Sequence, residues 1–87
     1  MSMLVSVLYF GVLKDVMGQA SERVTLAEGA TVRECVERFR RTGLGPAGMW
    51  DSIAVAVNQE YARADRALCE GDEVALLPPV SGGSRAD

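Results

Sequence analysis

The sequence predicts a single α+β domain in which one main amphipathic helix covers one face of a mixed β-sheet. Three observations support this prediction. The chain has 87 residues, which is enough for one modest hydrophobic core. Its 48% hydrophobic content is typical of a globular protein and argues against a disordered chain. Segments of strand composition stand near both ends, on either side of a segment with helical periodicity.

Two strands and a short helical turn are expected in the first third of the chain. Residues 5–10 are mostly β-branched and aromatic and end at Gly11, which predicts a first strand. Residues 13–17 then predict a turn of helix closed by Gly18. Residues 22–26 alternate polar and apolar side chains, so we expect a second strand that forms a hairpin with the first.

The main helix is predicted to begin after Thr31 and to end at Gly43. Thr31 and Glu34 have the spacing of a capping box, in which each side chain bonds the other residue's backbone N–H. The apolar residues that follow at helical spacing are Val32, Cys35, Val36 and Phe39. Charged residues take the opposite side, so this helix has one face suited to a core.

Further strands complete the predicted sheet. Residues 53–57 are an apolar run that ends at the turn-forming Asn58, with a continuation expected at residues 60–62. Residues 73–77 form the last strand, entered through a turn at residues 70–72. Because the first and last strands are apolar on both faces, we expect them to lie parallel and adjacent in the middle of the sheet. This order of elements is that of the β-grasp fold of ubiquitin-like proteins.

The alternation along the two central strands predicts an uncovered apolar face, because only one face of the sheet can meet the helix. The residues expected under the helix are Val5, Val7, Val74 and Leu76. Those expected on the opposite face are Phe10, Leu77 and Tyr61. An exposed apolar patch of this kind usually marks a protein interface. The alternative is that the loop at residues 44–50 folds over this face and buries it.

Composition excludes several classes of function. Nine Lys and Arg stand against twelve Asp and Glu, and no basic run is present that would neutralise a phosphate backbone. Residues 3–13 are apolar, but they lack the basic start and the cleavage site of a signal peptide and are too short to span a bilayer. We therefore expect a cytoplasmic protein that has neither nucleic acid nor a membrane as a partner.

Motifs for catalysis or metal binding are weak. The chain has no His, which removes the usual general base and the commonest metal ligand. Cys35 is expected in the core and Cys69 in a polar turn, so neither is expected to carry sulfur, and no metal site is predicted. Residues 43–48 match the dinucleotide pattern G-x-G-x-x-G, but they follow a helix instead of a strand, so we interpret them as a loop.

The composition of the C-terminal segment indicates a functional role more than a place in the folded domain. The domain is predicted to span residues 1–77, and residues 78–87 are predicted to be a flexible tail. Two prolines end the last strand, and Gly82-Gly83 follow without side chains. At ~3.3 Å per residue, the tail would project about 20 Å by its second glycine. Such a tail can thread a narrow channel; the alternative is a terminus with no role.

The chemistry that uses such a tail is acyl activation of a free glycine carboxylate. ATP adenylates the carboxylate, and a sulfur nucleophile then attacks the acyl-adenylate to give a thiocarboxylate, which is a sulfur donor. Three segments resemble the small subunit of molybdopterin synthase, a family of ubiquitin-like sulfur carriers: residues 7–10, 55–61 and 71–83. The last segment, which reads GDEVALLPPVSGG, is the most specific.

The resemblance implies a function, its partners and its site residues. An ATP-dependent activating enzyme (an adenylyltransferase) adenylates Gly83, beside Gly82, and a sulfurtransferase converts it to the thiocarboxylate. The tail then enters the large subunit of molybdopterin synthase and donates sulfur to cyclic pyranopterin monophosphate in molybdenum cofactor biosynthesis. The residues implied in partner contact are Phe10, Tyr61, Leu77, Pro78, Pro79, Val80 and Ser81. The chain would be a non-catalytic, sulfur-donating subunit that binds no cofactor, with ATP used by the activating partner.

The departure from the family is the segment 84–87, because it ties the Gly83 carboxyl into a peptide bond. A peptidase removes these residues, or they are a remnant of recombinant expression, or the protein has lost sulfur transfer and kept only binding; we favour the first two. The functional alternatives are a carrier that serves another pathway once residues 84–87 are removed, and a ubiquitin-like modifier or binding module without sulfur transfer.

Overall fold

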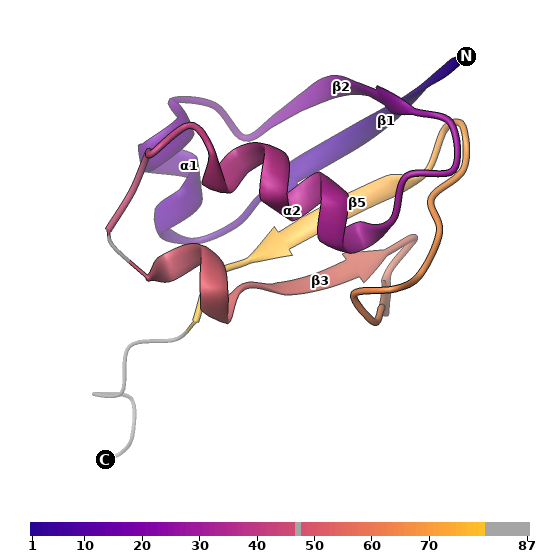
Figure 1. Ribbon diagram of the computed structural model, residues 1–87. Helices are drawn as coiled ribbons and strands as arrows, with labels where there is room; N and C mark the ends of the chain where they lie inside the picture. The colour runs from indigo at the N-terminus through magenta and orange to yellow at the C-terminus, as the bar shows by residue number, and fades with distance from the viewer. Residues whose placement is uncertain (47, 80–87) are drawn as a thin grey trace.

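A computed structural model describes residues 1–46 and 48–79 of the chain (Figure 1). Its elements are β1 (Ser2–Tyr9), α1 (Val12–Met17), β2 (Ser21–Ala27), α2 (Val32–Arg40), the 3₁₀ helix η1 (Met49–Ser52), β3 (Ala54–Val57), β4 (Glu60–Tyr61) and β5 (Glu73–Leu77). The bounds predicted for the last strand are those observed for β5. The short helix closed by Gly18 is also confirmed, since Gly18 caps α1 in the left-handed conformation.

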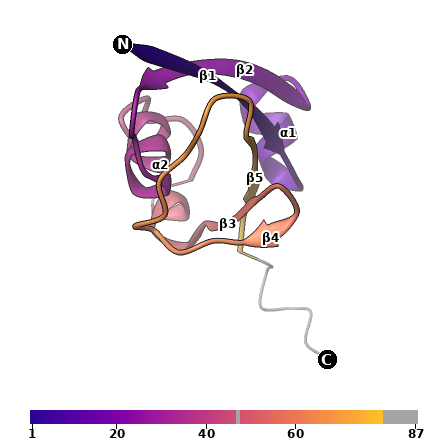
Figure 2. The same cartoon turned by 90° about the vertical axis from the view of Figure 1, so that its right-hand side faces the viewer.

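The five strands form one mixed sheet in the order β2-β1-β5-β3-β4. β1 and β5 are central and parallel, with Val7 opposite Val74 and Tyr9 opposite Leu76, while the other pairs are antiparallel. The sheet curves around α2, which lies on one side of it (Figure 2). The predicted β-grasp fold, with its parallel central pair, is therefore confirmed. Among the described residues, no helix has the length and apolar character needed to cross a membrane.

Helix α2 begins as the sequence predicts. The Glu34 carboxylate accepts a hydrogen bond from the Thr31 backbone N–H at 2.8 Å, and the Thr31 hydroxyl accepts one from the Glu34 N–H at 3.3 Å. The helix ends at Arg40, three residues before the predicted end at Gly43. Beyond Arg40 the chain forms shorter turns. The Gly43 N–H donates a hydrogen bond to the Arg40 carbonyl, and the Thr42 hydroxyl donates one to the Phe39 carbonyl.

The core fills the space between α2 and the inner face of the sheet, which we define as the face that α2 covers. Tyr9 and Phe39 pack edge to face with ring centroids 5.9 Å apart. Phe39 also stacks on Trp50 of η1 at 5.7 Å. The end of the segment 44–50, where η1 begins, thus packs on the helix side of the sheet, with Met49 and Trp50 both buried. The alternative in which this loop covers the opposite face is wrong.

The β3–β4 turn and the start of β5 are held together by side-chain hydrogen bonds. Asn58 and Gln59 both have positive φ, as a tight two-residue hairpin turn requires. The Asn58 amide donates to the Asp72 carboxylate at 3.0 Å, and its carbonyl oxygen accepts from the Glu73 N–H at 3.0 Å. Asp72 also accepts from the Cys69 N–H at 2.8 Å. These bonds confirm the predicted turn before the last strand.

Candidate docking face and root of the tail

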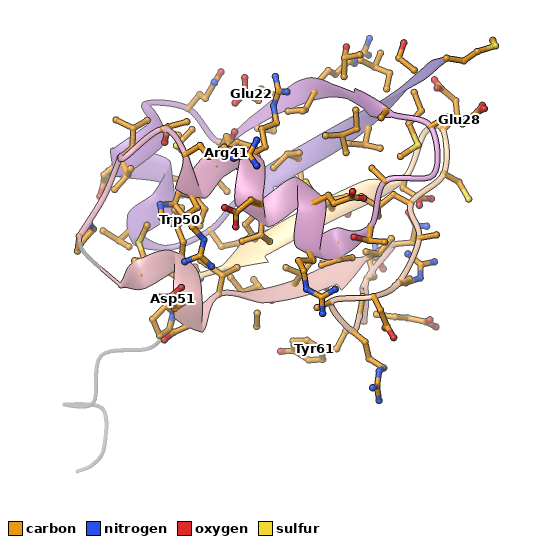
Figure 3. The ribbon with its side chains drawn as sticks, in the orientation of Figure 1. Glu22, Glu28, Arg41, Trp50, Asp51 and Tyr61 are labelled. Carbon is orange, nitrogen blue, oxygen red and sulfur yellow. The ribbon has the colours of Figure 1, made fainter. Side chains whose placement is uncertain are left out.

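The face of the sheet away from α2, here called the outer face, carries a row of apolar residues. The strand register places Leu8, Ala75, Ala56 and Tyr61 in one row across four strands. Tyr61 is 81% exposed, and Figure 3 shows its side chain at the margin of the sheet. Helix α2 lies on the other side of the sheet (Figure 2), and Phe10 and Tyr61 on this face stay exposed.

Phe10 and Leu77 lie at the end of the outer face from which the tail leaves. Phe10 follows β1 and is 43% exposed, while Leu77 is the last residue of β5 and is partly exposed. The Phe10 N–H donates to the Leu76 carbonyl at 3.3 Å, which brings the two chain segments together. Tyr61 is on the same face but lies two strands away from β5, at the sheet edge. The structure thus groups Phe10 with Leu77 and places Tyr61 apart from them.

The root of the tail, Pro78, packs against the β1–α1 turn. A Cβ added to Gly11 would lie 3.2 Å from Pro78 Cγ, and Gly11 has a φ of +55° that L side chains rarely adopt. The turn and the proline therefore fit together only because residue 11 is glycine. Pro78 is partly buried and Pro79 is exposed. The predicted contact residues Val80 and Ser81, and the predicted reactive end Gly82-Gly83, lie outside the described residues.

Two titratable side chains of the core, Cys35 and Tyr9, have raised pKa values. Burial raises the pKa of the Cys35 thiol to about 11. Burial also raises the pKa of Tyr9 well above its usual value, and the hydrogen bond that its hydroxyl donates to Glu22 adds to the effect. Cys35 is therefore a core residue, as the sequence predicts, and is poorly suited to act as a thiolate.

The described residues show no group of three or more His, Cys, Asp or Glu that would hold a metal ion. Asp72 is buried, but the Asn58 amide and the Cys69 N–H account for both of its carboxylate oxygens, so its role is structural. The chemical capacity of this region is to dock on an apolar partner and to present the chain that follows Pro79.

One residue beside the tail root escaped the sequence-based prediction. Val12, at the start of α1, is 46% exposed and lies next to Pro78 and Pro79. The prediction started the short helix at residue 13, after the turn glycine, and gave Val12 no place. A lone exposed apolar residue beside a glycine carries no periodic signal, so only the folded structure reveals it.

Comparisons with known proteins identify relatives along nearly the whole chain. The ThiS family matches residues 7–83. The molybdopterin synthase sulfur carrier subunit of Chlamydomonas reinhardtii is 34% identical over 83 residues, covering 93% of this chain and all of the relative. Small archaeal modifier protein 1 of Haloferax volcanii is 36% identical over 84 residues, covering 85% of this chain and 94% of the relative.

A solved complex provides a structural relative. It contains subunits 1 and 2 of the molybdopterin-converting factor from Helicobacter pylori. The matching chain has a TM-score of 0.60 and 25% sequence identity, with 93% of this chain and all of that chain covered. The likeness extends over the whole β-grasp domain.

Proposed function

This chain belongs to the ThiS family, and we propose that it is the sulfur-carrier small subunit of molybdopterin synthase, acting through the carboxylate of Gly83. The observation that carries the proposal is the family match, which covers residues 7–83 and so ends at Gly83. The named function of the Chlamydomonas relative supports the choice of pathway.

The reaction takes place at the tail, and partner enzymes supply the catalytic groups. A Gly83 carboxylate oxygen attacks the α-phosphorus of ATP on an activating enzyme, and pyrophosphate leaves. A persulfide sulfur on a sulfurtransferase then attacks the acyl carbon and AMP leaves. A thiol reductant cleaves the S–S bond of the resulting acyl disulfide, which gives the thiocarboxylate. The tail next enters the large subunit, where the thiocarboxylate sulfur is transferred to cyclic pyranopterin monophosphate. Glycine at both terminal positions keeps the tail slim enough for such channels.

The outer face provides the docking surface in this scheme. Phe10 and Leu77 stand beside the tail root, so a partner that binds them is already placed over the first residues of the tail. Apolar anchors of this kind supply most of the binding free energy of an interface. We propose that the large subunit docks here, with Tyr61 as a more distant contact at the sheet edge.

The Gly83–Ser84 peptide bond must be hydrolysed before activation, because an amide carbonyl has no carboxylate oxygen to attack ATP. We therefore propose that a peptidase removes residues 84–87 in the cell. The ATP-dependent step also favours a cytoplasmic location.

Intact-mass analysis of the protein isolated from its native host tests this function. We expect a chain that ends at Gly83, part of which is heavier by the difference between sulfur and oxygen. An actively growing cell that contains only chains still carrying Ser84, with no species ending at Gly83, would contradict the carrier function.

A second function is favoured by the Haloferax volcanii relative, which is named a small archaeal modifier protein. In that case the activated Gly83 would form an amide with a lysine of another protein. The same mass measurement distinguishes the two functions, since a modifier gives larger conjugates that contain the Gly83 acyl group on a lysine.

A further inference from the structure

The root of the tail forms one wall of an apolar pocket that the docking face does not include. The pocket, here called the collar pocket, has a volume of about 330 Å³ and is lined by Val12, Pro46, Gly48, Met49, Pro78 and Pro79. Its lining residues come from α1, from η1 and the loop before it, and from the chain after β5. None of these six residues carries a charge.

Close packing fixes the shape of the collar pocket. On one side, Pro78 packs against Gly11, and the Lys14 N–H bonds the Gly11 carbonyl at 3.1 Å, which ties the start of α1 to the tail root. On the other side, a Cβ added to Gly45 would lie only 2.6 Å from Met49 Cε, so the end of the Met49 side chain lies over Gly45. The pocket is therefore present before a partner binds.

The length of the tail indicates what covers the pocket. Gly83 is four residues after Pro79, so it lies within about 13 Å of the pocket wall when the tail is fully extended. An enzyme that takes Gly83 into a buried active site must bring the mouth of its channel at least that close. Phe10 and Leu77 lie beside the same root, so a partner that covers them and surrounds the tail also covers the collar pocket.

We propose that the collar pocket receives an apolar side chain that projects from the mouth of the tail-binding channel of the large subunit. This inference rests on the proposed function, because it requires Gly83 to be taken into that channel. A pocket with apolar walls and no charged group binds an aliphatic or aromatic side chain best. The contact fixes the direction in which the tail enters, in addition to the affinity that the outer face supplies.

The test compares two matched substitutions, Val12→Glu and Leu44→Glu, in a chain that ends at Gly83. The two side chains are 46% and 43% exposed, but only Val12 lines the collar pocket. A glutamate at the first position of α1 is favourable for the helix, so the fold should be preserved. Calorimetric titration with the large subunit should show binding weakened about tenfold or more by Val12→Glu and unchanged by Leu44→Glu. Val12→Leu should bind like the unaltered chain.

Failure of this inference is distinguishable from failure of the proposed function. If Val12→Glu binds the large subunit as tightly as the unaltered chain while a Phe10 variant binds weakly, the collar pocket is not a contact and the function stands. Equal losses from Val12→Glu and Leu44→Glu would also overturn the inference, as would a defect confined to the activating enzyme. If the unaltered chain does not bind the large subunit, the proposed function itself fails.

Discussion

Both faces of the central strands carry apolar residues, but the two faces have different roles. On the inner face, Tyr9 and Leu76 lie opposite each other and are almost fully buried under α2. On the outer face, Phe10 and Leu77, each the next residue along the chain, remain partly exposed at the root of the tail. In a domain of this size one helix covers only one face.

The difference shows that consecutive residues of a strand have separate roles: one stabilises the fold and the next is available to bind a partner. An inner residue contributes to the free energy of unfolding, because its burial accompanies folding. An outer residue contributes to the free energy of association, because it becomes buried only when a partner binds. A substitution at an inner position should therefore change mainly the free energy of unfolding, and one at the neighbouring outer position mainly the free energy of association.

The largest expected effect is on stability at the inner face. Leu76→Ala should lower the free energy of unfolding by about 3 kcal/mol, because it leaves a cavity at a fully buried site. Leu77→Ala removes the same atoms from a partly exposed position and should cost about 1 kcal/mol. Urea unfolding of both variants measures the difference. Equal losses would mean that the outer face is also core.

The next effect is on binding at the outer face. Phe10→Asn should weaken binding to the large subunit by about 2 kcal/mol, because it removes an aromatic anchor beside the tail root. Its matched control is Leu4→Asn, which changes an exposed apolar residue of β1 at the end remote from the tail. We expect the control to bind normally. A loss of binding in both variants, with both folded, would extend the interface along the whole strand.

A smaller effect is expected from the hydroxyl of Tyr9. Tyr9→Phe removes the hydrogen bond to Glu22 and should cost about 1 kcal/mol at neutral pH. The fold raises the pKa of Tyr9 above its usual value of 10.0, so the stability from this shift is complete below pH 10 and is lost as pH rises toward the folded pKa. Part of the alkaline loss of stability should therefore disappear in Tyr9→Phe.

Urea unfolding of both proteins at about pH 8 and about pH 10.5 measures this change. Cys35 also has a raised pKa, but its contribution is common to the two proteins and cancels in the comparison. If the variant and the unaltered chain lose the same stability between the two pH values, the raised pKa of Tyr9 does not contribute to the pH dependence of the free energy of unfolding.

Local signals in the sequence sufficed for most of the fold. The capping box at Thr31, the glycine after α1 and the apolar run of β5 each depend on a few neighbouring residues, and the structure has all three. The two-sided apolar character of β1 and β5 predicted their central, parallel pairing. The outer positions of Phe10 and Leu77 then followed from alternation alone.

The features that escaped prediction depend on contacts between distant segments. Trp50 stands in a loop rich in Gly and Pro, where no periodicity shows that it stacks on Phe39 and turns that loop toward α2. The collar pocket joins residues 12, 46, 49 and 78, which are spread over most of the chain. Helix α2 ended early because hydrogen bonds from Thr42 and Gly43 form turns that composition does not reveal.

The most direct test of the proposed reaction is to supply the activating enzyme, ATP and a sulfur source with two forms of this chain. One form ends at Gly83 and the other retains residues 84–87. Intact-mass analysis should show that sulfur replaces one oxygen in the form that ends at Gly83, while the longer form stays unchanged. Sulfur incorporation in both forms, or in neither form although both are folded, would contradict the assignment of the Gly83 carboxylate as the reactive group.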